Sequence, residues 1–201
     1  MAQDAALGLA VLFAAMLAAR VQFAPGRFRP PWLTLGVMAL LALALAAQLV
    51  SPDVLLRYRR DATHIIGEGQ YYRLFTALWL QDAGGRGGLY NLAMLGIIGA
   101  SAEQYWDRRL WLACYFGVGL AIEVLALGWQ PSGAGNSIAV FGLAGSLLAL
   151  TRDRKPALYI PRAIGVAAAV MLAWQRDIHG AAALLGAFLG MAFARTRWAR
   201  N

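Results

Sequence analysis

The sequence predicts an all-α polytopic membrane protein that forms one compact helical bundle. Of its 201 residues, 60% are hydrophobic and 14% are charged, whereas a soluble domain has about half and about a quarter. Several apolar runs approach or exceed the length of a membrane-spanning helix. The net charge of +8 comes from residues that separate these runs. It therefore indicates no nucleic-acid partner, and the expected surroundings are a lipid bilayer.

Seven apolar segments are expected to form helices. They are residues 5–22, 33–50, 87–105, 110–127, 135–150, 160–174 and 179–195. No basic stretch precedes the first segment, so we expect an uncleaved helix rather than a signal peptide. The predicted organisation is an additional N-terminal transmembrane helix with a cytoplasmic linker at 1–32, followed by the core bundle at 33–201.

The positions of Lys and Arg predict that the N-terminus lies outside and the C-terminus in the cytoplasm. This orientation puts twelve basic residues inside and six outside, as the positive-inside rule requires. Its weak point is the basic cluster Arg57-Tyr-Arg-Arg60, which falls outside. The outer segment 51–86 is too long and polar for an ordinary connection, and its aromatic content predicts structure in the membrane interface. The segment could anchor the protein or contact a substrate.

A single hydroxyl, Ser137, lies just inside the start of the apolar helix expected at 135–150. That helix rises about 24 Å, less than the hydrocarbon thickness of roughly 30 Å. If the charged run 152–155 holds the inner end at the membrane surface, Ser137 lies below the outer surface. Non-helical backbone at that depth needs protein or water around it. Ser137 is therefore expected in a wet pocket inside the membrane.

The chain has two histidines, and His179 opens the last apolar segment. Ser137 and His179 lie roughly 20 and 22 Å above the inner boundary, and therefore at nearly the same depth. Small residues on both helices allow close approach. We expect the imidazole to reach the hydroxyl, as a nucleophile and its base require, with Phe141 packing against the ring. The small residues are Ala183, Gly186 and Gly190 on one helix and Gly142 and Ser146 on the other.

The start of helix 135–150 also offers hydrogen-bond donors to a developing oxyanion. The backbone N–H of Ser137 is unpaired there and lies at the positive end of the helix dipole. Asn91, a polar side chain in an apolar segment, is a candidate second donor. The plainer interpretation is that each residue only packs or hydrogen-bonds between helices. The same residues could also line the pore of a small transporter or channel.

Four motifs occur in order between residues 51 and 195. They are Gly69-Gln-Tyr-Tyr-Arg, Tyr90-Asn-Leu with Ala102-Glu-Gln, Gly135-Asn-Ser, and Ile178-His-Gly. This ordered set resembles the rhomboid family of intramembrane serine proteases. In that family the motif serine is the nucleophile, the histidine of the last helix is the base, and the asparagine of the second core helix assists the oxyanion.

The resemblance implies a six-helix core, preceded here by one N-terminal helix. It implies cleavage of peptide bonds in or near the transmembrane helices of substrate proteins by a Ser137–His179 dyad, with no metal and no other cofactor. Asn91 would assist the oxyanion, with Gly135, Phe141 and Gly186 in supporting positions. Ala- and Arg-rich usage is typical of GC-rich bacteria, so a bacterial inner membrane is the expected location. The sequence names neither the substrate nor the oligomeric state.

The chain departs from the family pattern in the expected oxyanion site. Gly87 stands where the family usually has a histidine, four residues before the asparagine. That donor is either absent or supplied by Arg86, Gln81 or backbone amides of the glycine-rich turn. Ile138 also replaces a common glycine, and Phe141 a common tyrosine. The missing histidine leaves a second function open, a catalytically weak relative that binds membrane clients without cutting them.

Four further residues carry expectations of their own. Glu103 is expected to pair with basic groups at the cytoplasmic boundary. Glu123 is expected near the outer end of its helix or protonated, because a carboxylate inside a membrane is costly. Asp177 could bias the charge of His179, but the expectation is that it is only a solvated loop residue. Cys114 is expected to be a small core residue.

Overall fold

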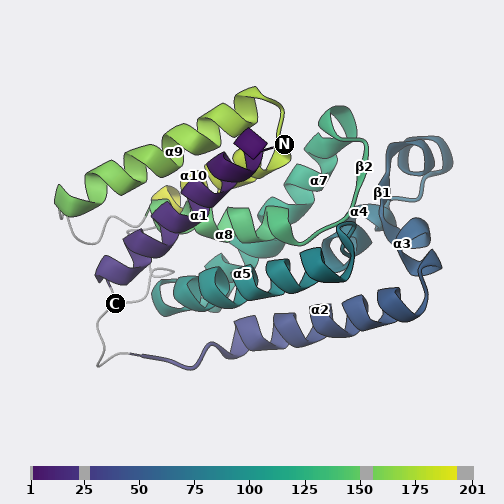
Figure 1. Ribbon diagram of the computed structural model, residues 1–201, viewed down its shortest axis with the longest axis horizontal. Helices are drawn as coiled ribbons and strands as arrows, with labels where there is room; N and C mark the ends of the chain where they lie inside the picture. The colour runs from purple at the N-terminus through teal and green to yellow at the C-terminus, as the bar shows by residue number, and fades with distance from the viewer. Residues whose placement is uncertain (1, 23–27, 150–155, 194–201) are drawn as a thin grey trace.

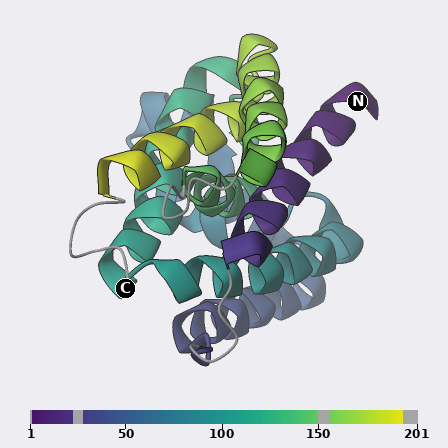
Figure 2. The ribbon, with the colours of Figure 1, turned by 90° about the vertical axis from the view of Figure 1, so that its left-hand side faces the viewer.

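The computed structural model describes residues 2–22, 28–149 and 156–193. These residues form one helical bundle (Figures 1 and 2). The α-helices are α1 (Ala2–Gln22), α2 (Trp32–Val50), α3 (Asp53–Tyr58), α4 (Tyr72–Thr76), α5 (Gly84–Tyr105), α6 (Arg108–Leu112), α7 (Val118–Trp129), α8 (Ser137–Leu148), α9 (Tyr159–Trp174) and α10 (Ile178–Phe193). Short π-helical turns occupy Thr63–Gly67 and Ala113–Gly117, and 3-10 turns occupy Ala77–Trp79 and Pro156–Leu158. The strands are β1 (Arg60–Asp61) and β2 (Ser132–Gly133).

The all-α prediction is confirmed, and each of the seven predicted segments contains a helix. The segment predicted at 110–127 is one continuous helical stretch, in which Ala113–Gly117 joins α6 to α7. Residues 150, 194 and 195 of the predicted segments lie outside the described residues. The charged run 152–155, expected to hold the inner end of the serine helix, also lies outside them.

Three described helical stretches are long and apolar enough to cross a membrane. They are Gln3–Arg20, Trp32–Val50 and Arg108–Trp129. The apolar helices α8, α9 and α10 are shorter, with 12, 16 and 16 residues. The protein is an integral, polytopic membrane protein, and its orientation in the membrane stays a prediction.

Helix α8 forms the centre of the bundle. Every residue from Ile138 to Leu148 is buried, as expected for a helix that is apolar on all sides. Figure 2 looks nearly along α8 and shows α1, α5, α9 and α10 around it. This central position explains why a helix of 12 residues can lie inside the membrane, because its ends contact protein rather than lipid.

Helices α8 and α10 touch backbone to backbone through their small residues. A Cβ atom built on Gly186 would lie 1.9 Å from the carbonyl oxygen of Gly142, and one on Gly145 would lie 1.9 Å from that of Ala183. A Cβ atom on Gly190 would lie 2.7 Å from the carbonyl oxygen of Ser146. The close approach expected from these small residues is therefore present.

The outer segment 51–86 is folded and is tied to the chain just before α8. Strand β1 pairs antiparallel with β2, which places Arg60 opposite Gly133. The motif residue Arg73 is buried and donates to the carbonyl oxygens of Leu56 at 3.0 Å and Arg59 at 3.1 Å. This arginine therefore holds the fold of the segment itself.

Two buried carboxylates have partners distant in sequence. Glu123 is buried against the equally buried Arg60 and accepts a hydrogen bond from its guanidinium. The sequence prediction for Glu123 did not include this cation. Because Arg60 is buried in this ion pair, it is not part of the exposed basic cluster expected in the outer segment. Glu103 accepts from the backbone N–H groups of Leu33 at 3.1 Å and Thr34 at 2.9 Å. It therefore caps the start of α2, where a carboxylate is favoured by the helix dipole.

Candidate active site

Ser137 is the first residue of α8 and follows a tight segment that leads from β2. The backbone N–H of Gly135 donates to the carbonyl oxygen of Ala77 at 3.0 Å. A Cβ atom on Gly135 would lie 3.4 Å from Ser137 Oγ, so glycine keeps the space beside the hydroxyl free. Because Ser137 begins the helix, its own N–H has no acceptor within the helix and stays available to a ligand.

The imidazole of His179 lies beside this hydroxyl. His179 is the second residue of α10, and its Nε2 atom is 2.9 Å from Ser137 Oγ. Phe141, one turn after Ser137, contacts the imidazole edge to face, with ring centroids 4.9 Å apart and an interplanar angle of 61°. The hydrogen bond expected from the helix faces is therefore present, with a phenyl ring in the expected place. A hydroxyl bonded to an imidazole nitrogen is the geometry of a nucleophile and its base.

Asp177 also belongs to this group, contrary to the expectation that it is a solvated loop residue. Its Oδ1 atom lies 2.7 Å from His179 Nδ1 and accepts from the backbone N–H of His179 at 2.8 Å. Burial raises the pKa of the carboxyl, but the hydrogen bond and charge of His179 outweigh that effect, and the pKa lies below its ordinary value of 3.8. The sequence contained a usable signal, because an aspartate directly before a helix commonly caps it.

The candidate oxyanion donor Asn91 is held by a chain of buried amides. Its Nδ2 atom donates to Gln81 Oε1 at 2.7 Å, and Gln81 Nε2 donates to Asn136 Oδ1 at 2.8 Å. The backbone N–H of Gln81 donates to Gln48 Oε1 at 2.9 Å, and Gln48 Nε2 donates back to the Gln81 carbonyl oxygen at 2.6 Å. Since an amide nitrogen carries two hydrogens, Asn91 keeps one donor for a ligand. Sequence reasoning missed Gln48 and Asn136.

The position of the absent histidine offers no space for a side chain. A Cβ atom on Gly87 would lie 2.3 Å from the Cβ of Ala83. Of the suggested replacements, Arg86 is exposed and is not among the residues that line the pocket beside Ser137. Gln81 is buried, and its side chain already bonds Asn91 and Asn136. Ser137 and Asn91 both line this pocket, so the N–H of Ser137 and the Asn91 amide are candidate donors, and the backbone amides of the glycine-rich turn stay a prediction.

These groups border a cavity of about 560 Å³. Its wall is mostly apolar, and it contains the hydroxyl, the imidazole and three exposed or half-buried aspartates. Helix α1 forms one side of it, and a Cβ atom on Gly8 would lie 3.3 Å from the ring of Phe141. The lining residues are Asp4, Ala5, Gly8, Leu9, Leu12, Asp82, Ala83, Gly87, Tyr90, Asn91, Met94, Ser137, Val140, Phe141, Leu172, Asp177 and His179.

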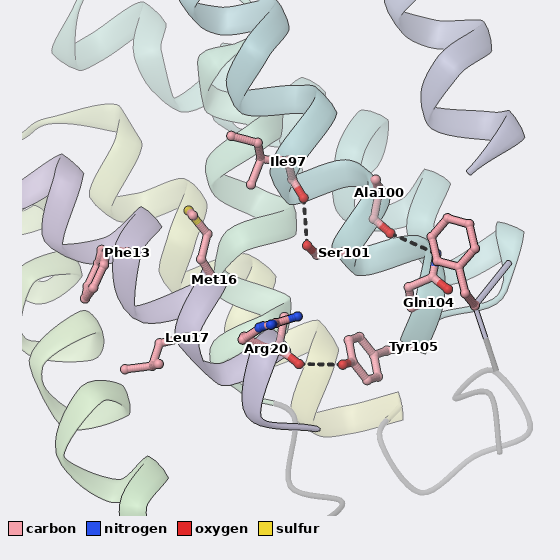
Figure 3. A pocket seen from close by; sticks show the side chains of 11 residues that line it. Phe13, Met16, Leu17, Arg20, Ile97, Ala100, Ser101, Gln104 and Tyr105 are labelled. Atoms are coloured by element: carbon pink, nitrogen blue, oxygen red, sulfur yellow. Dashed lines mark hydrogen bonds between the residues drawn. The ribbon is translucent and has the colours of Figure 1, made fainter. Parts of the chain in front are cut away.

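A second pocket, of about 450 Å³, lies between α1 and α5 (Figure 3). It also contains a serine, but the hydroxyl of Ser101 donates to the carbonyl oxygen of Ile97 at 2.7 Å. The hydroxyl of Tyr105 is likewise bonded to the carbonyl oxygen of Ala19. No histidine lines this pocket, so Ser101 has no base beside it among the described residues. The two pockets therefore differ in chemistry although both are apolar.

A serine hydroxyl bonded to an imidazole at the wall of a pocket has the geometry of a serine-hydrolase site. Comparison with protein families finds a match to the Rhomboid domain over residues 68–200. This match covers more than half of the chain, and the protein belongs to the rhomboid family, whose members act on transmembrane substrates within the bilayer. Comparisons with curated proteins and with solved structures found no match.

Proposed function

We propose that this protein is an intramembrane serine endopeptidase in which Ser137 is the nucleophile and His179 the general base. The observation that carries the proposal is the hydrogen bond of 2.9 Å between Ser137 Oγ and His179 Nε2 at the wall of a pocket inside an apolar bundle. Membership of the rhomboid family supports the same reaction.

The reaction follows from the donors and acceptors around the hydroxyl. Ser137 Oγ attacks the carbonyl carbon of the scissile peptide bond as His179 Nε2 takes its proton. The resulting oxyanion accepts hydrogen bonds from the N–H of Ser137 and from Asn91 Nδ2. His179 then returns the proton to the leaving amine. The same imidazole then takes a proton from a water molecule, whose oxygen attacks the acyl carbon. The ester bond to Ser137 Oγ breaks as Oγ takes that proton back from His179, and the new carboxyl group is released.

The expected substrates are transmembrane helices with small residues near the scissile bond. A peptide bond in a regular helix is shielded by its side chains and by its own backbone hydrogen bonds. Small residues expose the carbonyl carbon, and a locally weak helix allows the backbone to extend into the pocket. The pocket of about 560 Å³ has room for a few residues in an extended conformation.

Labelling with a serine-directed fluorophosphonate tests the nucleophile. We expect the wild type to be labelled, and to cleave a model transmembrane substrate in proteoliposomes, whereas Ser137→Ala loses both activities and His179→Ala loses at least a hundredfold of each. Ser101→Ala is the matched control, because it removes the serine of the second pocket and should change neither. Labelling that survives in Ser137→Ala would show that the assignment is wrong.

The absence of a side chain at Gly87 favours one alternative, a weak relative that binds membrane clients. In that case the wild type would bind the model substrate without cleaving it, and substitution of Ser137 would not change the amount of captured substrate. Cleavage at any measurable rate that depends on Ser137 decides against this alternative.

A further inference from the structure

We propose that Asp177 is a positioning residue for His179, which holds the imidazole by its Nδ1 atom and stabilises the imidazolium formed during the reaction. This inference rests on the proposed function. It adds a third member to the pair that the sequence and the family resemblance imply, so that the arrangement becomes Ser137, His179 and Asp177.

The geometry exceeds what a helix cap requires. A capping aspartate accepts from a backbone N–H in the first turn of its helix, and Asp177 does so with the N–H of His179 at 2.8 Å. The same oxygen also lies 2.7 Å from the ring nitrogen Nδ1 of His179. Both bonds go to one residue, so they fix the backbone and the ring of His179 together.

The backbone of Asp177 is itself held on both sides. Its N–H donates to the carbonyl oxygen of Leu172 at 2.9 Å, and its carbonyl oxygen accepts from the N–H of Gly180 at 3.2 Å. The preceding residue, Arg176, has a φ of 59°, and its N–H donates to the carbonyl oxygen of Ala173 at 3.0 Å. This is the helix-ending motif that usually has glycine in the left-handed position. A non-glycine residue in this conformation costs about 1 kcal/mol or more. The turn that positions Asp177 therefore lowers the stability of the fold.

The Asp177 carboxylate determines which nitrogen of the His179 imidazole carries the proton. A hydrogen bond from Nδ1–H to Asp177 leaves the lone pair on Nε2, which faces Ser137 Oγ at 2.9 Å. When Nε2 takes the serine proton, the ring becomes a cation beside an anion. The Asp177 oxygen 2.7 Å from Nδ1 attracts this cation, because opposite charges interact most strongly at short distance.

Other ionisable groups border the same cavity and do not replace Asp177. Asp4 on α1, Asp82 before α5 and Tyr90 on α5 line it, and Arg176 adjoins Asp177 in the turn. Asp82 accepts from the backbone N–H of Ala134 at 3.1 Å. Among the described residues, Asp177 is the ionisable group whose oxygen lies within hydrogen-bond distance of the imidazole.

The test compares substitutions that separate capping from charge. Asp177→Asn can keep both hydrogen bonds through its amide oxygen but removes the charge, and Asp177→Ser can cap the helix but cannot reach the ring. We expect kcat to fall about 10-fold in Asp177→Asn and about 100-fold in Asp177→Ser, at or below the lower end of the roughly 10²- to 10⁴-fold contribution of a general base, because Asp177 acts through His179. KM should change little. The acidic limb of the pH–rate profile should move to lower pH in Asp177→Asn, because the imidazolium loses its anion.

Nitrogen-15 chemical shifts of the imidazole report the tautomer directly. In His64→Gln, which leaves a single histidine, we expect the Nδ1-protonated form with Asp177 intact and a mixture of tautomers after Asp177→Ser. Asp107→Asn is the matched control, because Asp107 caps α6 through the N–H of Leu110 at 2.9 Å and lies outside the site. That control should leave kcat and the pH profile unchanged.

The proposal is overturned if Asp177→Asn and Asp177→Ser keep the kcat, the pH profile and the tautomer of the wild type, even where they lower the thermal stability. If Asp177→Ser does not fold, the acidic limb of the pH–rate profile of Asp177→Asn still tests the proposal. Failure of the proposed function looks different, because Ser137 would then not be labelled in any variant, and the tautomer measurement would still report the role of Asp177.

Discussion

The two sides of Ser137 are built in opposite ways. On the imidazole side, Asp177 and His179 are two residues apart at the start of one helix, and a single carboxylate orients the ring. On the oxyanion side, Asn91 depends on amides from separate parts of the chain, through Gln81. The imidazole side is built from residues that are close in sequence, and the oxyanion side from residues that are distant in sequence.

This difference predicts how each side fails. A buried amide that loses its partner carries the full cost of desolvation, about 1–3 kcal/mol. A substitution on the oxyanion side therefore also destabilises the amides that were bonded to the replaced residue. On the imidazole side, Asp177 directly precedes α10 and His179 is its second residue, so the position of both depends on how closely α10 approaches α8. Substitutions can therefore test the two sides separately.

The largest effect is expected from removing the side-chain donor to the oxyanion. Asn91→Ala should lower kcat about 10²- to 10³-fold, the usual cost of losing one such donor, with little change in KM. Steady-state cleavage of a transmembrane substrate measures both. Gln104→Ala is the matched control, because Gln104 is an amide on the same helix that bonds the backbone of Arg29. A kcat within about twofold of the wild type would mean that the oxyanion is stabilised without Asn91.

The imidazole side is tested next by moving α10. Gly186→Ala puts a methyl group 1.9 Å from the carbonyl oxygen of Gly142, which forces the two helices apart. Because a displacement of about 1 Å can cost 10²-fold in rate, we expect a loss of about that size in kcat, together with a lower melting temperature. Gly36→Ala on α2 serves as the control, since a Cβ atom there meets nothing within 4 Å. Unchanged kinetics in Gly186→Ala would contradict the backbone contact.

A double-mutant cycle then measures how separate the two sides are. Gln81→Met removes the acceptor that orients Asn91, so combining it with Asn91→Ala should give a coupling energy of about 0.5–3 kcal/mol in kcat/KM. Combining Gln81→Met with Asp177→Asn should be additive within about 0.5 kcal/mol. Equal coupling in both cycles would show that the two sides act as one network.

The smallest effect concerns stability at low pH. The folded-state pKa of the Asp177 carboxyl lies below 3.8, so this group adds stability above its unfolded pKa and loses it as the pH falls through the folded pKa. The difference in melting temperature between the wild type and Asp177→Asn should therefore shrink on going from neutral pH to below 3.8. Thermal unfolding in detergent micelles at several pH values measures it. A difference that stays constant over this range would contradict the lowered pKa.

The Ser137–His179 contact could be predicted because it depends on regular helix geometry. Rise per residue sets the depth of each side chain, and the pattern of small residues identifies the faces that meet. The amide network could not be predicted in the same way. Gln81 lies in a non-helical segment whose path depends on long-range contacts, and the same is true of Arg60, which reaches Glu123 only because β1 pairs with β2.

Asp177 falls between these cases. Its position as a helix cap follows from a local sequence rule, whereas its contact with the ring depends on the turn at Arg176. That turn adopts a left-handed conformation at a residue with a side chain, which sequence patterns do not indicate. Gly87 departs from the family pattern, and the neighbouring Ala83 explains why a larger residue does not fit there.

The wall of the reaction pocket combines α1, through Gly8, with α10, through His179. In the chain, α10 follows both α1 and α8. A nascent chain that has inserted α1, α5 and α8 already holds the serine but lacks its base. In the proposed mechanism, hydrolysis therefore requires that α10 has packed against α8, because His179 is the base for Ser137.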